Sequence, residues 1–193
     1  MSLLLITDAA TEPVTLAEAR LHLRLASDYT TEDATISALI KAARRMAEHE
    51  LGRALITQTW EEVLDAFPAD EIELTMPKVL AITSIKYIDT DEVEQTITST
   101  NYSLDSSKLP GWVKPAYGLD WPTDVLDSTN VVRVRYTAGY GAASDVPEEI
   151  KTWMKLQIEA MWRTRGSFIT GVSVSEVPNR WVASMLDRER VYA

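Results

Sequence analysis

Residues 32–52 of the 193-residue chain read EDATISALIKAARRMAEHELG. Apolar residues recur there every three or four positions, which is the period of one face of an α-helix. The apolar stripe consists of Ile36, Leu39, Ile40, Ala43, Met46, Ala47 and Leu51. Arg44 and Arg45 fall mostly outside it, and Gly52 follows its last residue, where a glycine readily takes the left-handed conformation that ends a helix. The pattern predicts an amphipathic helix over residues 32–51.

A shorter helix is predicted before this one. Thr15 and Glu18 have the spacing of a capping box, in which the two side chains satisfy backbone N–H groups of the first helical turn. The apolar residues that follow share one face as far as Arg24. The first quarter of the chain is therefore expected to be helical.

From residue 54 onward the pattern changes to short apolar runs separated by Pro, Gly, Asp and Ser. Candidate strands cover residues 55–64, 71–75, 82–89, 93–98, 112–114 and 131–137. In the last run two arginines alternate with Val132, Val134 and Tyr136, so the two kinds of side chain point to opposite faces. This segment predicts a half-buried antiparallel sheet.

Helical spacing returns after residue 145, where Pro147 suits the first helical position and two glutamates complement the helix dipole. This long helix is predicted to stop at Gly166. Beyond it, residues 171–177 indicate a flexible or strand-like link, and Asn179 opens a short last helix. The C-terminal quarter is therefore helical again.

The charge divides in the same way as the predicted elements. The formal net charge is −10, of which residues 54–144 carry −8, whereas residues 1–53 carry −2 and residues 145–193 carry none. We therefore expect an α+β fold. Its helical bundle core is built from both chain ends, with an acidic, antiparallel β-rich insertion between the second helix and the long third helix.

Composition excludes several classes of protein. The chain has no Cys, which removes disulfide frameworks, thiolate metal sites and cysteine nucleophiles. The apolar run at residues 3–6 lacks a basic flank, so no signal peptide is expected. No apolar window approaches the length of a membrane span, and a chain this acidic does not attract nucleic acid in bulk. We expect no membrane partner.

Two motifs that resemble ligand sites fail in detail. The run GYGAAS at residues 139–144 follows a strand and precedes a helix, as a dinucleotide-binding fingerprint does. Its third small residue is a serine, however, and too little chain remains for further parallel strands. The acidic cluster within residues 89–94 lacks the glycine and the third ligand of a calcium loop. Both are interpreted as structural turns.

Paired carboxylates and histidines offer no catalytic arrangement either. Glu61 and Glu62 are adjacent, so on a strand they point to opposite faces and cannot act as an acid/base pair. His22 and His49 each lie near glutamates, which favours surface ion pairs. We expect no catalytic residues, no cofactor and no metal, and hence no enzyme.

Two short arginine pairs leave a second function open. Arg44 with Arg45, and Arg163 with Arg165, are placed on or beside predicted helices where they could touch phosphate. A solvated face or a carboxylate partner is the more ordinary explanation of such arginines. The alternative function is a small DNA-binding or regulatory protein.

Short runs along most of the chain together resemble tailed-phage head-tail connector (adaptor) proteins. They are PVTLAEAR (13–20), ALIKAAR (38–44), GRALITQTW (52–60), LDAFP (64–68), ITSIKYID (82–89), PAYG (115–118), WP (121–122), VRVRYTAGYG (132–141) and VPEEI (146–150). No single run is diagnostic, but their order and spacing are specific. The tail from Ser167 onward matches least.

The resemblance implies a structural virion protein at the head-tail interface, assembled in the host cytoplasm. It implies a homo-oligomeric ring, commonly twelvefold, attached below the portal protein, with a tail-side closure (stopper) or tail protein beneath it. Genomic DNA would pass through the channel without specific binding. Because a short last helix has little core of its own, we expect a C-terminal docking arm for the portal or a neighbouring subunit. Its candidate docking residues are Trp181, Met185, Leu186, Arg188, Arg190 and Tyr192.

Overall fold

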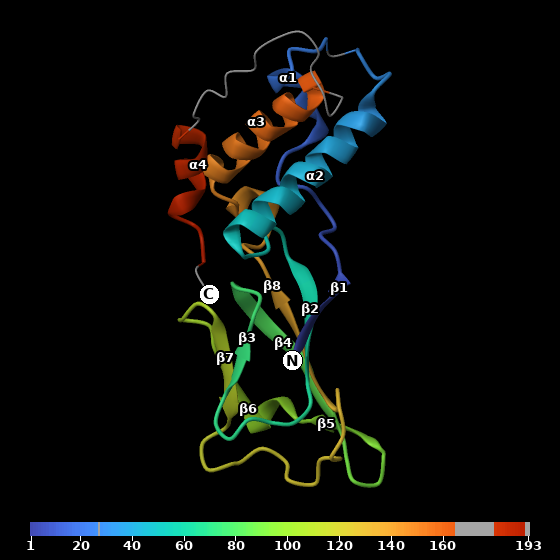
Figure 1. Ribbon diagram of the computed structural model, residues 1–193, viewed down its shortest axis with the longest axis vertical. Coiled ribbons are helices and arrows are strands. Elements are labelled where there is room, and N and C mark those ends of the chain that lie inside the picture. The colour runs from blue at the N-terminus through green and yellow to red at the C-terminus, as the bar shows by residue number, and fades with distance from the viewer. Residues whose placement is uncertain (27, 165–179, 192–193) are drawn as a thin grey trace. The chain divides into compact units, whose positions relative to one another are not determined.

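A computed structural model describes residues 1–26, 28–164 and 180–191 of the chain (Figure 1). The described residues form a mixed α+β structure with four α-helices and two antiparallel sheets. Their contacts divide into two compact units. The sheet unit comprises residues 1–10 and 56–140, and the helical unit comprises residues 11–55 and 141–193.

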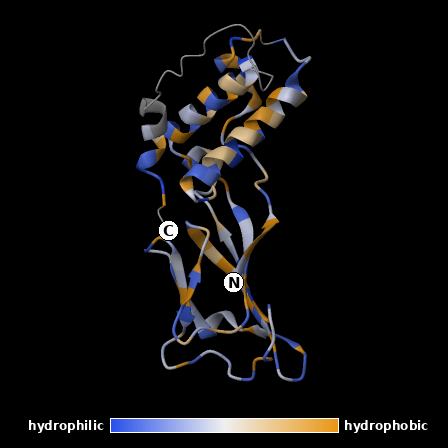
Figure 2. Cartoon of the chain, viewed as in Figure 1, coloured by the Kyte–Doolittle hydropathy of each residue, from blue (hydrophilic) through white to orange (hydrophobic). Residues whose placement is uncertain are grey.

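The helical unit is built around two long helices. Its helices are α1 (Leu16–His22), α2 (Asp33–Leu51), α3 (Glu148–Thr164) and α4 (Arg180–Asp187). Helices α2 and α3 pack against each other, and α1 and α4 each contact both. Figure 2 shows hydrophobic and hydrophilic residues mixed along α2 and α3, as amphipathic helices require. Their buried apolar residues include Ile36, Ile40, Ala43, Ala47, Leu51, Ile150, Trp153, Met154 and Ile158.

Local signals place the helix ends where the sequence predicts them. The Thr15 hydroxyl accepts a hydrogen bond from the Glu18 N–H at 3.2 Å, and the Glu18 carboxylate accepts one from the Thr15 N–H at 2.7 Å. The Thr15 side chain also lowers the pKa of Glu18. At the end of α2, Gly52 has φ of 65°, the left-handed conformation expected there. The capping box and the terminating glycine are both confirmed.

Two side chains of α2 differ from the expected pattern. Met46, assigned to the apolar stripe, is 42% exposed, whereas Arg44, expected outside it, is 1% exposed. The buried face is centred on Ile36, Ile40 and Ala47, which puts Arg44 inside its border and Met46 beyond it. The face of α2 that packing buries is therefore turned about the helix axis relative to the apolar stripe predicted from the sequence.

The sheet unit contains eight strands in two antiparallel sheets. They are β1 (Ser2–Thr7), β2 (Gln58–Leu64), β3 (Ile72–Leu74), β4 (Val79–Ile88), β5 (Glu94–Ile97), β6 (Tyr102–Asp105), β7 (Gly111–Pro115) and β8 (Val132–Ala138). The strand orders are β1-β2-β8-β4-β5 and β3-β7-β6. All the strands except β1 lie between α2 and α3 in sequence, as the predicted insertion requires.

Strands β1 and β6 were not expected. β1 lies within residues 1–53, which the sequence analysis grouped with the helices, yet it pairs with β2 along the edge of the larger sheet. Its continuous apolar run has no alternation to indicate a strand, and β6 is only four residues long. Pairing with distant strands, rather than local pattern, makes both of them strands.

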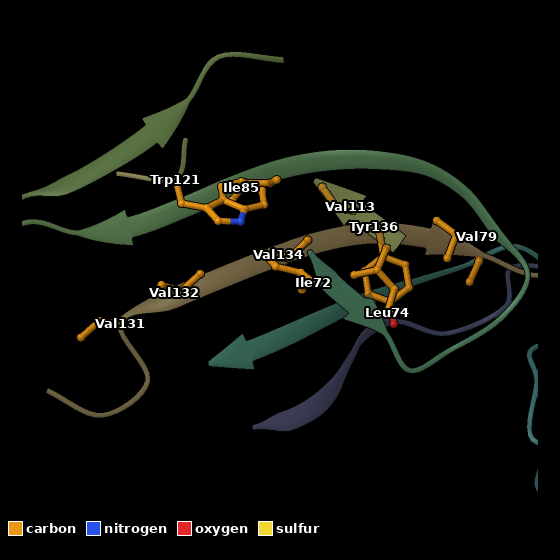
Figure 3. Close-up of a cluster of buried hydrophobic side chains, with 11 residues drawn as sticks. Ile72, Leu74, Val79, Ile85, Val113, Trp121, Val131, Val132, Val134 and Tyr136 are labelled. Carbon is orange, nitrogen blue, oxygen red and sulfur yellow. The ribbon is translucent and has the colours of Figure 1, made fainter. Parts of the chain in front are cut away.

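One hydrophobic core joins the two sheets. Figure 3 shows this cluster, in which Val132, Val134 and Tyr136 of β8 lie with Leu74 of β3 and Val113 of β7. These side chains are fully buried. The alternation predicted for β8 is therefore confirmed, with its apolar residues on the core side.

Candidate functional site

The C-terminal segment carries the predicted docking residues, and the structure ties it to the end of α2. Leu186 of α4 is 2% exposed and belongs to the core of the helical unit. The Val191 N–H donates to the Leu51 carbonyl oxygen at 2.9 Å. This carbonyl is one of those that the end of a helix leaves without an intrahelical donor. The segment after α4 thus completes the C-terminal end of α2.

Two arginines strengthen the same attachment. Arg190 donates from Nε to the Glu50 carbonyl oxygen at 3.0 Å and from a terminal nitrogen to the Glu50 carboxylate at 3.1 Å. Arg53, which is 6% exposed, donates to the Glu189 carboxylate at 3.3 Å. Cationic groups are favoured at the negative end of a helix dipole. The segment from Leu186 to Val191 is therefore held by apolar, backbone and ionic contacts together.

The candidate docking residues differ in how much of each side chain is available. Leu186 and Arg190 are engaged within the helical unit, Met185 is half-buried, and Arg188 is exposed. The Trp181 side chain and Tyr192 lie outside the described residues. That these residues dock on a partner stays a prediction.

Carboxylates of the chain itself contact one arginine of each pair considered for phosphate binding. Arg44 donates from Nε to Glu12 at 2.8 Å and from a terminal nitrogen to Glu48 at 2.9 Å, within the helical unit. Arg163 lies 2.5 Å from the Glu159 carboxylate, and Arg165 lies outside the described residues. Carboxylates thus pair with Arg44 and Arg163, and the burial of Arg44 removes it from any phosphate site.

The glycine-rich run at residues 139–144 is a turn between β8 and α3. The Gly139 N–H donates to the Lys78 carbonyl, and a Cβ at Gly139 would lie 2.5 Å from the Ile56 carbonyl oxygen. The Ala142 N–H donates to the Asp145 carboxylate at 2.9 Å. Glycine is needed here for a close backbone approach, and a side-chain carboxylate of the chain itself occupies the position of an anion.

The acidic cluster between β4 and β5 is a hairpin turn, as predicted. One oxygen of Asp89 accepts from the Asp91 N–H at 3.0 Å and the Val93 N–H at 2.9 Å, and the other accepts from Gln95 at 2.6 Å. These hydrogen bonds, the one from Val93 foremost, lower the pKa of Asp89. Lys86 pairs with Glu94 across the hairpin. The carboxylates stabilise the turn itself.

Among the residues that the structure describes, no three His, Asp or Glu side chains lie close enough together to hold a metal ion. The helices of these described residues also include none that is long and apolar enough to cross a membrane.

An open cleft of about 650 Å³ lies in the sheet unit, beside the loop that follows β7. The Leu119 N–H donates to the Ala116 carbonyl at 2.9 Å, and Gly118 has φ of 77°, which together form a turn that leaves Tyr117 fully exposed. Asp70 and Lys114 both line the cleft. The charges that line the cleft are therefore mixed.

The sheet core contains a buried carboxylate, Glu62, that the sequence pattern did not indicate. Glu61 and Glu62 do point to opposite faces, as expected, and Glu61 pairs with Arg135 at 2.7 Å. Glu62 is 1% exposed and accepts hydrogen bonds from the Thr75 N–H and hydroxyl at 3.2 and 3.1 Å. The Tyr136 hydroxyl accepts from the Met76 N–H at 3.0 Å and lies 3.5 Å from Glu62. Nothing local marks Glu62, because its partners are Thr75, just after β3, and Tyr136 of β8.

Glu62 is expected to make stability depend on pH. Burial raises its pKa above the ordinary value, so the folded protein binds this proton more readily than the unfolded chain does. Its contribution favours folding fully below the ordinary pKa and is lost as the pH rises through the raised pKa. Glutamine at this position does not titrate, so the Glu62→Gln variant lacks this loss. In urea unfolding, the free energy of unfolding of Glu62→Gln minus that of the native protein should therefore be larger at about pH 7 than at about pH 4. An equal stability difference at both pH values would contradict this.

Comparison with known proteins links this fold to phage-like particles. A chain from the neck of an empty GTA particle, computed with C6 symmetry, matches with a TM-score of 0.79 and 23% identity, covering 100% of this chain and 97% of that one. A chain from the virion of a native gene transfer agent (GTA) particle matches with a TM-score of 0.77 and 22% identity, over the same shares of the two chains. A chain from the neck of a native GTA particle, computed with C12 symmetry, gives 0.75 and 21%, again over those shares. At these identities the likeness establishes the fold.

A comparison with curated proteins found no match. The family model described as phage gp6-like head-tail connector protein matches residues 13–113, just over half of the chain. The match confirms the resemblance seen in the sequence, and the family consists of structural connectors rather than enzymes. The chain therefore belongs to the phage gp6-like head-tail connector family.

Proposed function

We propose that this head-tail connector works as one subunit of a closed ring in the neck of a tailed phage or phage-like particle. The observation that carries the proposal is the likeness over the whole chain to subunits of necks computed with C6 and C12 symmetry. Closed rings arise when each copy offers two different, complementary surfaces to its neighbours. The ring would lie at the head-tail interface of the virion, with the portal protein on one side and a tail-side closure or tail protein on the other.

In this proposal the helical unit is the ring-building core and the sheet unit is an insertion into it. The division of contacts supports this arrangement, since residues 11–55 and 141–193, which flank most of the sheet unit in sequence, join in the helical unit, while residues 1–10 add a strand to the sheet unit. The acidic charge of residues 54–144 suits a surface that faces solvent or passing DNA. A channel through which genomic DNA slides should not hold phosphates, because each phosphate neutralised by a basic side chain adds affinity.

We further propose that the C-terminal segment docks on the portal protein or on a neighbouring subunit. Its contacts suggest that the candidate residues have two different roles, anchoring the segment and meeting the partner. Leu186 and Arg190 hold the segment against α2, and Met185 and Arg188, with Trp181 and Tyr192, would meet the partner. Among these, Arg188 is an exposed arginine on an anchored segment, and arginine is enriched among residues that dominate protein interfaces.

Reversing the charge of Arg188 should impair docking without unfolding the protein. An interface arginine of this kind contributes about 2 kcal/mol, so Arg188→Glu should weaken attachment about thirtyfold. The measurement is the fraction of portal-bearing heads joined to tails, counted by electron microscopy with purified variant protein. Arg24→Glu is the matched control, because Arg24 is also exposed on the helical unit, in the turn after α1.

The two variants separate docking from folding. If both give the native thermal unfolding curve and only Arg188→Glu loses joining, docking through this segment is supported. Normal joining by Arg188→Glu would remove the docking assignment and leave ring membership untouched. Ring membership is tested separately by native mass spectrometry of necks released from particles. Necks that do not contain a fixed whole number of copies of this chain would refute the proposed ring.

A further inference from the structure

The outer edge of β1 is an apolar surface that the described residues leave uncovered. Leu4, Leu5 and Ile6 are consecutive and are 48%, 42% and 42% exposed. Leu4 lies opposite Glu61 and Leu5 opposite Trp60 of β2, so their side chains point to opposite faces of the sheet. Along its other edge, β1 has no strand partner among the described residues. Backbone N–H and C=O groups of an edge strand are open to pairing with another chain.

The other three sheet edges are short. β5, β3 and β6 contain four, three and four residues, and β5 begins with the charged Glu94. Short strands and charged residues are the usual means by which proteins prevent unwanted edge pairing. β1 has six residues with no charge and no proline. This edge therefore lacks that protection, and β5, at the other end of the same sheet, carries only one charge, that of its first residue, Glu94.

We propose that the free edge of β1 pairs with the free edge of β5 in a second copy of this chain, so that the larger sheet continues from subunit to subunit. The inference rests on the proposed ring. β1 and β5 are the two ends of one sheet, and four antiparallel pairings separate them, so both strands run in the same direction. For strands that run along the ring axis, the rotation that relates ring neighbours preserves this direction, which makes the new pair parallel. The two edges are the two different surfaces that a ring requires.

The side chains of the two strands are compatible in this pairing. Following the pairing across the sheet, Leu4 shares a face with Thr96, and Leu5 shares the core face with Ile97. Placing Leu4 beside Thr96 puts Leu5 beside half-buried Ile97 and the uncharged Ser2 beside Glu94. Each copy carries a formal net charge of −10, so contacts between copies are favoured where like charges do not meet. A second copy thus fits the edge in direction, face and charge.

Disulfide trapping tests this contact, because the native chain has no cysteine. The double variant Leu4→Cys/Thr96→Cys should give a ladder of covalent oligomers beyond the dimer on a non-reducing gel after oxidation of the assembled protein. Each single variant should stay monomeric. The matched control is Leu4→Cys/Leu21→Cys, since Leu21 is 79% exposed but lies on α1 of the helical unit, and it should give no ladder.

Each outcome separates the edge contact from the ring itself. Dimers from Leu4→Cys alone would mean that β1 pairs with its own copy, which overturns the inference. Absence of a ladder while native mass spectrometry still detects rings also overturns it, and the proposed function stands. Absence of both ladder and ring refutes the proposed ring as well. As a second variant, Leu4→Glu should lower the ring population at least tenfold, whereas Leu21→Glu should leave it unchanged.

Discussion

Replacing Arg44 with alanine should lower the free energy of unfolding by about 3 to 5 kcal/mol, because breaking a buried ion pair leaves an uncompensated charge. Arg44 is 1% exposed and donates to the Glu12 and Glu48 carboxylates at 2.8 and 2.9 Å. Glu48 also accepts from the Leu55 N–H at 3.1 Å. Arg44 therefore joins the segment before α1, the helix α2 and the residues after α2 at one point.

Arg45→Ala is the matched control, since Arg45 is the next residue of the same helix and is exposed. Its effect should stay within about 0.5 kcal/mol, as for most surface substitutions. Urea unfolding followed by circular dichroism measures both variants. Equal effects of the two substitutions would mean that the buried ion pairs do not stabilise the helical unit. If Arg44→Ala lowered the affinity for DNA and left the free energy of unfolding unchanged, this result would support the DNA-binding alternative.

Replacing Trp121 with alanine should cost the sheet unit about 3 to 5 kcal/mol, the range for removing a buried tryptophan or phenylalanine. Trp121 is 8% exposed, and its ring stacks on Phe67 with centroids 5.0 Å apart and an interplanar angle of 8°. Its indole N–H donates to the Asp70 carbonyl at 3.0 Å. Truncation removes apolar burial, an aromatic contact and a hydrogen bond at once.

Tyr117→Ala provides the comparison for Trp121, because Tyr117 belongs to the same loop and is fully exposed. Its effect on unfolding should stay within about 0.5 kcal/mol. Hydrogen exchange resolves the expected result, with faster exchange in β7 and β8 for Trp121→Ala and native exchange for Tyr117→Ala. Native protection in both variants would show that the Trp121 contacts are not needed for this core.

The elements that could be predicted have strong local signals. Helix α2 has a long amphipathic period and a terminating glycine, α1 has a capping box, and β8 alternates between apolar and polar residues. The order of short motifs along the chain was also sufficient to indicate the connector family, which the family match confirmed. Six of the strands lie within or close to the ranges expected for them. In each case the relevant interactions join residues that are near in sequence.

The features that could not be predicted depend on residues far apart in sequence. Arg44 is buried because Glu12, 32 residues away, lies against it, and Glu62 is buried because Tyr136, 74 residues away, closes the sheet core. β1 is an edge strand only because β2 brings residues 58–64 beside it. The periodicity of a segment indicates its secondary structure, but it does not indicate which distant residues will contact that segment in the folded chain. The helices, the acidic middle segment and the family therefore follow from sequence, whereas the buried charges and the exposed edge of β1 follow from tertiary contacts alone.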